Sequence, residues 1–353
     1  MRALATIRKI EAINPIENAD AIDVASIGGW NVVVKKGQHN VGEFVTYFEI
    51  DSWIPEHLAP FLGTSGVPAK VYEEVAGFRL KTKKLRGVVS QGLILPVKDC
   101  KELDGIELVE DQDVTELLNI KKYEQAVAAN LAGFARGNFP SFIPKTDAER
   151  IQNLKRNLEE WNERHLTFEV TEKLDGTSCT MYHYDRLAED GKDVIGVCSR
   201  NIDLKDTEGN VYWETAKATG IIEVLKSEAR NIAIQGEIIG AGIQGDKYNF
   251  KTSRHFFVFN IFNIDTQTYF TPAERLEFCK KHNLTMVPII FDVFHIGNTV
   301  QGLLDLATNG SVVNVTSTLA FQCLREGLVF KCHEIPSISF KAISNEWLLK
   351  YDK

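Results

Sequence analysis

The sequence predicts two domains, a small all-β barrel followed by a mixed α+β domain with helices and strands interleaved. Its 353 residues exceed what one hydrophobic core of about 250 to 300 residues supports. Short β-type runs broken by turn residues fill the chain up to about residue 97, which is typical of a small barrel. Beyond residue 146, apolar strand runs alternate with helical patterns. A Gly-, Pro- and Phe-rich stretch over 133–146 reads as an extended linker, and we expect domains over residues 1–130 and 131–353.

Composition places the chain among globular proteins, with 44% hydrophobic and 25% charged residues. A net charge of −8 excludes a wholesale polycation, although a local basic face remains possible. The six cysteines are dispersed, without the spacing of a zinc knuckle or redox dithiol, so we expect free thiols in a reducing compartment, the cytoplasm or another. Arg8 and Lys9 lie where a signal peptide would have its apolar central region. No apolar run reaches the length of about 18 residues that a membrane-spanning helix needs. We expect an intracellular monomer that does not bind membranes.

The N-terminal half contains five β-type runs, and an acidic stretch follows them. The runs cover residues 4–13, 21–27, 30–37, 43–50 and 87–97. Residues 99–116 carry eight acidic side chains, which indicates a solvated connector.

The C-terminal half combines helices and strands. Thr146 followed by Glu149 has the capping-box form, and apolar residues then recur at spacings of three and four from Ile151 to Trp161, which predicts a helix. A second capping box begins at Thr271, and residues 211–230 are also helical in pattern. Strand runs cover residues 166–174, 193–200, 231–239, 255–264, 286–294 and 326–332. Many of these are apolar on both faces, as expected for covered central strands.

Several common catalytic motifs are absent from the sequence. It has no Gly-rich phosphate loop ending in Gly-Lys-Ser/Thr, no G-x-G-x-x-G that opens a helix, no H-E-x-x-H and no G-x-S-x-G. Its eight histidines are dispersed.

A lysine at the end of a strand is the first candidate. Glu172 and Lys173 close the run over 166–174, and Asp175 and Gly176 follow. A charged turn that closes a strand is the plain alternative. A lysine attacks an activated phosphate only when neighbouring cations, a metal or desolvation lower its pKa, so a working lysine needs specific neighbours.

Candidate neighbours follow at strand ends. Arg200 offers a planar fork for phosphate or ribose oxygens. Glu237 and Glu326 interrupt apolar strands, which is costly unless a carboxylate is paired or serves a metal. With Asp175 they could hold hydrated magnesium through water. Phe259 could stack on a purine.

A late lysine completes the set, because Lys341 in an alternating strand could neutralise an α-phosphate. Strand-end charges and exposed strand lysines remain the alternative for each of these residues.

The order of these segments resembles the covalent nucleotidyltransferases, the superfamily of ATP-dependent ligases and mRNA capping enzymes. EKLDG, SRN, FVFNI, EGLVFK and SFK occur in the order of motifs I, Ia, III, IV and V. The resemblance implies an α+β nucleotidyltransferase (adenylation) domain with antiparallel sheets, and use of ATP with Mg²⁺ or Mn²⁺. It implies that Lys173 forms a lysyl–adenylate, Phe259 stacks on adenine and Arg200 contacts the ribose and the substrate end.

The resemblance implies further roles. Glu237 and Glu326 assist the metal, Lys341 contacts the α-phosphate, and the nucleotide site also includes Glu172, Lys331 and Gln152. The family often has a second lysine two residues from that of motif V, whereas this sequence has Ser339 and Ile343 there.

The position of the barrel narrows the resemblance to one branch. Only residues 342–353 follow Lys341, too few for a C-terminal domain, so the barrel stands in front as an N-terminal OB module. This order and the stretch KTDAERIQN resemble RNA ligases of the Naegleria type, which implies sealing of 3′-hydroxyl and 5′-phosphate ends at nicks in duplex RNA.

A dense basic run lies in the N-terminal module. Lys81, Lys83, Lys84 and Arg86 fall within RLKTKKLR. OB barrels commonly bind nucleic acid, so we expect this run, with Arg200, to contact the RNA backbone. The alternative is a solvated face.

Two other functions remain open. A DNA ligase or a GTP-using capping guanylyltransferase is disfavoured because no C-terminal barrel follows motif V. The N-terminal stretch also resembles OB modules that bind tRNA, so a non-catalytic RNA-binding protein is the third hypothesis.

Overall fold

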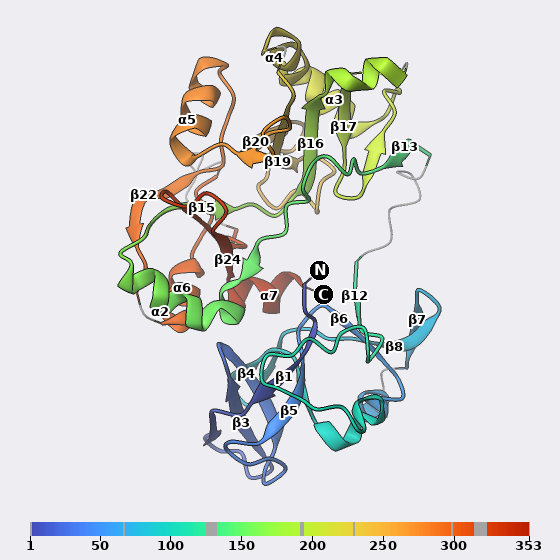
Figure 1. Cartoon of the computed structure of the whole chain (residues 1–353), viewed down its shortest axis with the longest axis vertical. Helices are drawn as coiled ribbons and strands as arrows, with labels where there is room; N and C mark the ends of the chain where they lie inside the picture. Colours follow the sequence, from blue (N-terminus) through green and yellow to red (C-terminus); the bar gives the residue numbers. More distant parts are fainter. Residues whose placement is uncertain are drawn as a thin grey trace. The chain divides into compact units, whose positions relative to one another are not determined.

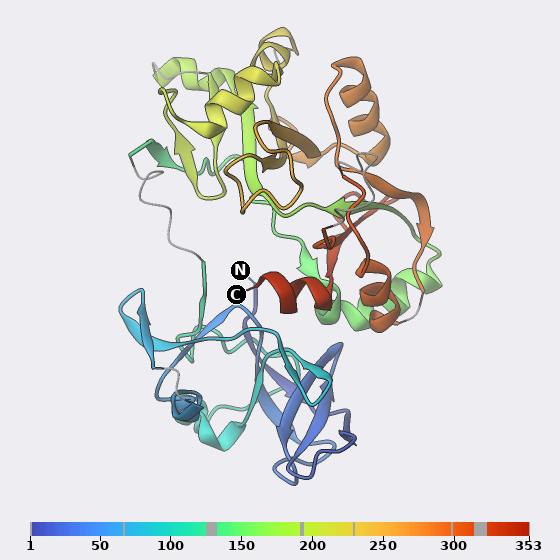
Figure 2. The same ribbon diagram turned by 180° about the vertical axis from the view of Figure 1, so that it is seen from behind.

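The computed structural model spans residues 1–353 and divides into two compact units (Figures 1 and 2). Unit 1 comprises Met1–Ala126, Ile151–Lys155 and Asn345–Lys353, and unit 2 comprises Val127–Arg150 and Arg156–Ser344. The structure describes residues 2–65, 68–124, 133–190, 194–228, 230–297, 299–313 and 323–352. The expected domain boundary after residue 130 falls outside the described residues.

Unit 1 is built from short antiparallel strands. They are β1 (Ala5–Lys9), β2 (Ala12–Pro15), β3 (Ile22–Ile27), β4 (Trp30–Lys35), β5 (Phe44–Phe48), β6 (Ser52–Pro55), β7 (Lys70–Tyr72), β8 (Val75–Arg79), β9 (Lys83–Leu85), β10 (Val88–Ser90), β11 (Leu93–Pro96) and β12 (Lys121–Lys122). They pair in the orders β1-β5-β11, β2-β3-β4, β12-β6-β8-β7 and β9-β10. The described ladders thus form four small antiparallel sheets, and the closure of these strands into a barrel stays a prediction.

All five β-type runs predicted for this half contain strands, but β6 to β9 were not predicted. These strands have three to five residues, too few for the apolar alternation to stand out. The acidic stretch over 99–116 is more than a solvated connector, because Leu103 and Val114 are buried in the unit 1 core. Helix α7 (Asn345–Tyr351) completes this unit, and Asp352 just after it pairs with Arg79 of β8 at 2.7 Å.

Unit 2 contains two larger sheets. Its strands are β13 (Ala135–Asn138), β14 (Glu149–Arg150), β15 (Thr167–Lys173), β16 (Thr177–His183), β17 (Ile195–Cys198), β18 (Ile202–Leu204), β19 (Ile232–Gly240), β20 (Arg254–Asn263), β21 (Thr268–Tyr269), β22 (Ile289–His295), β23 (Gly327–Cys332) and β24 (Ser339–Ile343). The seven-stranded sheet has the order β13-β18-β17-β16-β19-β20-β21, and the five-stranded sheet β14-β24-β23-β15-β22. Among the strands that the structure describes here, every pairing is antiparallel except β14 with β24. The stretch expected to be a linker thus contributes β13 to a sheet.

The helices of unit 2 follow the sequence only in part. They are α2 (Lys155–Glu163), α3 (Val211–Ala218), α4 (Ile221–Glu228), α5 (Pro272–Lys281) and α6 (Val300–Ala307). The capping box at Thr271 is confirmed, since its hydroxyl accepts from the Glu274 amide while the Glu274 carboxylate accepts from the Thr271 amide. The capping box predicted at Thr146 is wrong. Glu149 lies in β14, which pairs with β24, and helix α2 begins only at Lys155. The helical pattern over 211–230 is divided in two at Gly220, whose φ is +73°.

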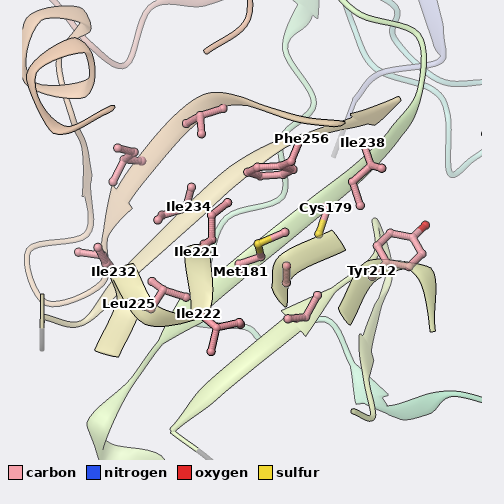
Figure 3. Packing of buried hydrophobic residues seen from close by; sticks show 14 of the residues in the cluster. Cys179, Met181, Tyr212, Ile221, Ile222, Leu225, Ile232, Ile234, Ile238 and Phe256 are labelled. Carbon is pink, nitrogen blue, oxygen red and sulfur yellow. The ribbon is translucent and has the colours of Figure 1, made fainter. Parts of the chain in front are cut away.

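Helices α3, α4 and α5 cover one face of the seven-stranded sheet (Figures 1 and 3). Ile221, Ile222 and Leu225 of α4 pack against Met181 of β16 and Ile234 of β19, and all five are buried. The cluster fixes β16 and β19 side by side, and these strands flank the candidate site described below.

The expectation of strands covered on both faces holds for β19 but not for β22. Eight of the nine β19 residues are buried, whereas Phe291 and Val293 of β22 are 37% and 58% exposed, because β22 is an edge strand. All six cysteines are unpaired, as expected. In the part of the chain that the structure describes, no helix is both long and apolar enough to cross a membrane.

Candidate active site

The candidate site lies where the chain passes from one sheet of unit 2 to the other. Lys173 ends β15 of the five-stranded sheet, and after three residues β16 begins in the seven-stranded sheet. Gly176 packs directly on β19: a Cβ placed there would lie 2.6 Å from Cγ2 of Ile239 and still closer to the carbonyl oxygen of Ile238. The glycine of the EKLDG segment therefore permits the crossing between the two sheets.

Three carboxylates predicted from the sequence surround Lys173. Its Nζ donates to Oε2 of Glu326 at 2.7 Å, and Glu326 directly precedes β23, the neighbour of β15. Oε1 of Glu237, on β19, accepts from the amide of Gly176 at 3.0 Å. Asp175 lies two residues from Lys173, and all three carboxylates act electrostatically on the lysine. The structure thus brings together residues that are spread over more than 150 positions of the sequence.

The carboxylates reverse the effect of burial on Lys173. Burial alone would lower the pKa of this lysine, but the charges of Glu326 and Glu237 outweigh it and raise the pKa above its ordinary value. Burial raises the pKa of Glu237 to about 8, against the opposing charge of Lys173. Burial likewise raises the pKa of Glu326, although the charges of Lys173 and Lys341 oppose it. A lysine that attacks a phosphate needs a lowered pKa. In this site, the carboxylates instead favour the ammonium form of Lys173.

Asp175 has two partners that the sequence analysis did not identify. Its carboxylate pairs with Nζ of Lys247, and its amide donates to the hydroxyl of Tyr248 at 2.8 Å. Burial raises the pKa of Tyr248 well above its ordinary value, which keeps the phenol neutral. Both partners come from the irregular segment between β19 and β20, where no periodic pattern or motif marks them.

Lys341 and Arg200 meet at one carboxylate. Nζ of Lys341, on β24, donates to Oδ1 of Asp147 at 2.9 Å. The guanidinium of Arg200, between β17 and β18, lies 3.6 Å from Oδ2 of the same residue. The side chain of Lys341 is 11% exposed and that of Arg200 is 51% exposed. Asp147 was missed by the sequence analysis, which assigned its neighbour Thr146 to a helix cap.

An apolar cluster adjoins Lys173. Leu174, Ile239, Tyr248 and Val287 form its buried part, and Phe259 of β20 packs against it while remaining partly exposed. The candidate purine-stacking ring therefore lies in the same cluster as the residue after Lys173.

Lys331 and Glu172 are fixed by their own contacts. Nζ of Lys331, on β23, donates to the carbonyl of Phe259 and to the side-chain oxygen of Asn260. Burial and the charge of Arg275 lower the pKa of Lys331 well below its ordinary value. Oε2 of Glu172 accepts from the amide of Val312 at 2.9 Å, and burial raises the pKa of this carboxyl. Both side chains are therefore held by contacts inside unit 2.

The three carboxylates have the donor atoms that a hard cation prefers, but their side chains are too far apart to bind one ion directly. Asp175, Glu237 and Glu326 offer only oxygen donors, which suit Mg²⁺ or Mn²⁺. Burial, together with the charges of Glu326 and Asp175, raises the pKa of Glu237, so an added positive charge would be favourable there. Within the described ranges, however, no three His, Cys, Asp or Glu side chains are close enough to ligate one ion directly. The assignment of a water-mediated metal to these three residues stays a prediction.

The remaining predicted residues belong to unit 1. Gln152 is buried there, and its Nε2 donates to Oε1 of Gln91 at 3.4 Å. Lys83 and Lys84 lie on β9, exposed, and Arg86 follows at the turn before β10 with a φ of +47°. Burial and the charge of Arg79 lower the pKa of Lys81. The roles of these residues stay predictions.

Two family models match the chain, and together they span most of it. The RNA ligase model matches residues 166–343, and a model of an OB-fold domain matches residues 4–97. The RNA ligase model covers the segments EKLDG, SRN, FVFNI, EGLVFK and SFK.

Solved structures match over the full length. A variant of Naegleria gruberi RNA ligase without ligand is 40% identical, with a TM-score of 0.88 and coverage of 100% of this chain and 99% of that one. A variant of that ligase with ATP and manganese is 41% identical, with a TM-score of 0.87 and 99% coverage of both chains. The same ligase with pyrophosphate is 41% identical, with a TM-score of 0.87 and coverage of 100% of this chain and 99% of that one. No curated protein matches the chain.

Proposed function

Because the chain belongs to the RNA ligase family, we propose that it is an ATP-dependent RNA ligase that joins 3′-hydroxyl and 5′-phosphate ends through a lysyl–AMP intermediate at Lys173. We take its substrate to be nicked duplex RNA, and its second domain to have the nucleotidyltransferase fold behind an N-terminal OB barrel. The observation that carries the proposal is the placement of Lys173, 2.7 Å from Glu326 and next to the Phe259 cluster.

Structures of Naegleria gruberi RNA ligase variants contain ATP, AMP and manganese, and one of that ligase contains pyrophosphate. These are the substrate, the transferred nucleotide, a metal and the leaving group of the step proposed for Lys173. They support ATP and a divalent metal, Mg²⁺ or Mn²⁺, as the cofactors of this chain.

The first step would transfer AMP to the lysine. The Lys173 amine attacks the α-phosphorus of ATP, a P–N bond forms, and the P–O bond to pyrophosphate breaks. The amine must first lose a proton, and Oε2 of Glu326, at 2.7 Å, is placed to accept it. Lys341 and Arg200 provide positive charge for the phosphates. A divalent cation at Asp175, Glu237 and Glu326 would offset phosphate charge and lower the lysine pKa.

The later steps would take place on RNA. The adenylate passes from Lys173 to a 5′-phosphate, and the neighbouring 3′-hydroxyl then displaces AMP to form the phosphodiester. Holding both ends on a duplex makes the last step effectively intramolecular. We assign backbone contacts to Lys81, Lys83, Lys84 and Arg86 of unit 1, since three of them lie on the exposed strand β9 or in the turn that follows it.

We also propose that the protein acts as a monomer in a reducing compartment inside the cell. Its six unpaired cysteines, five of them buried, are consistent with such a compartment.

Sealing and labelling assays test the proposed activity. Nicked duplexes with every combination of RNA and DNA at the two ends are incubated with ATP and Mg²⁺ or Mn²⁺, and ligation is followed on denaturing gels. We expect sealing of all-RNA nicks, and none with Lys173→Ala. Exclusive sealing of DNA ends would indicate a DNA ligase, and covalent label from GTP alone a capping enzyme. RNA binding without any covalent label would favour the non-catalytic alternative.

A further inference from the structure

One carboxylate occupies the point where two phosphate-binding side chains converge. Oδ1 of Asp147 accepts from Lys341 at 2.9 Å, and Oδ2 lies 3.6 Å from the guanidinium of Arg200. We propose that Asp147 is an internal substitute for a phosphate group, which pairs with these two cations and is displaced when a polyphosphate binds. The inference rests on the proposed function and adds a residue that sets the affinity for anionic substrates.

The segment that carries Asp147 is anchored on both sheets of unit 2. On one side, β14 begins two residues later and pairs in parallel with β24, with Arg150 opposite Lys341. On the other side, Nζ of Lys145 donates to Oδ1 of Asn201 at 2.9 Å. The carbonyl of Pro144 also accepts from the Gln235 side chain at 3.0 Å. Asp147 is therefore held between the sheets by its neighbours, and its contact with both cations follows from this path of the backbone.

The charges explain why an acidic residue belongs at this point. The Lys341 side chain is only 11% exposed, and a largely buried ammonium group without a counter-ion is unfavourable. Asp147 supplies one counter-ion, with its own side chain 30% exposed, and Lys341 also interacts electrostatically with Glu326. A triphosphate or pyrophosphate carries more negative charge and more acceptor oxygens than one carboxylate, so it can take over both cations. An anion with little charge displaces Asp147 from the two cations less easily. Asp147 therefore makes the site select polyphosphates over weakly charged anions.

A role in orienting Lys341 alone predicts a different result. If Asp147 served only to orient Lys341, its removal would weaken phosphate binding or leave it unchanged. If Asp147 competes with phosphate, its neutralisation strengthens the binding of every ligand that needs both cations.

Equilibrium binding to variants that cannot react tests the inference. Asp147→Asn, which keeps the size of the side chain, is combined with Lys173→Met, and calorimetry measures the affinities for ATP, pyrophosphate and adenosine. Compared with Lys173→Met alone, we expect ATP and pyrophosphate to bind about two- to fivefold more tightly, the range expected when a partly exposed ion pair is lost. Adenosine has no phosphate, so its affinity should not change. Loss of structure in the variant would instead lower the affinity for all three ligands.

The matched control is Asp206→Asn in the same background. Asp206 pairs with Lys217 at 2.6 Å in the same unit, and both side chains are about half exposed. We expect this variant to bind all three ligands as the parent does. Unchanged or weaker pyrophosphate binding in the Asp147→Asn variant would overturn the inference.

The design separates this inference from the proposed function. Pyrophosphate binding involves no covalent step, so tighter binding supports the role of Asp147 even if the wild-type protein forms no lysyl–AMP. If the wild-type protein forms lysyl–AMP and Asp147→Asn leaves pyrophosphate affinity unchanged, only the role of Asp147 is refuted.

Discussion

Replacing Gly176 by alanine should damage both the stability of unit 2 and the adenylylation step. The added Cβ would lie 2.6 Å from Cγ2 of Ile239, about 0.8 Å short of the 3.4 Å at which ordinary contact begins, and it would meet the carbonyl of Ile238 even sooner. The backbone at Gly176 has no positive φ, so the cost comes from space alone. Overpacking of this kind costs about 1 to 3 kcal/mol of unfolding free energy.

The Gly176→Ala change should also move the segment that follows Lys173 away from Glu237 on β19. The amide of Gly176 donates to Oε1 of Glu237 at 3.0 Å, and moving the crossing away from β19 lengthens this bond. The raised pKa of Glu237 leaves this carboxyl largely uncharged at neutral pH, so the bond contributes about 0.5 to 1.5 kcal/mol, and its loss adds to the overpacking. We therefore expect a lower urea midpoint and little or no lysyl–AMP.

The control for this prediction is Gly137→Ala. Gly137 lies on β13 of the same unit, and nothing comes within 4 Å of a Cβ at that position. The two variants are compared by urea denaturation and by single-turnover labelling with ATP. Gly137→Ala should change stability by less than about 0.5 kcal/mol and leave labelling intact. If Gly176→Ala matched Gly137→Ala in both assays, the close crossing against β19 would be refuted.

Three further predictions concern charge. The rate of lysyl–AMP formation should increase from neutral to alkaline pH in single-turnover labelling, because the raised pKa keeps Lys173 protonated at neutral pH, and a flat profile would contradict this. Arg275→Met should lower the unfolding free energy by about 3 to 5 kcal/mol in urea denaturation, since it leaves the buried carboxylate of Glu169 unpaired, and adding Glu169→Gln should recover much of the loss. Charge reversal at Lys83 and Lys84 should weaken RNA sealing in a salt-dependent way while ATP labelling stays normal, and unchanged sealing at raised salt would refute a contact with RNA.

Local patterns predicted the strands that carry the site. The alternating or apolar runs that end at Lys173 and begin at Glu326 became β15 and β23, which are neighbours. Glu237 and Glu326 were visible as charges that interrupt apolar strands, and Asp175 and Gly176 as a turn that closes one. Their mutual distances depend on which strands pair across more than 150 residues, and this was accessible only through the resemblance to a family.

The residues that were missed carry no periodic signal. Lys247 lies in an irregular segment, and Asp147 precedes a strand of two residues whose parallel pairing with β24 overrode an apparent capping box. The protonated state of Lys173 could not be predicted either, because it follows from how three carboxylates and burial combine in space. The sequence therefore predicted side chains that the structure brings together, but not the balance of charge among them.

The most direct test is to locate the AMP after incubation of the protein with ATP and Mn²⁺. Tryptic digestion and mass spectrometry should place an acid-labile AMP group on the peptide that contains Lys173, with pyrophosphate released in equal amount. Absence of an adduct in the wild-type protein, or an adduct on any other lysine, would contradict the account.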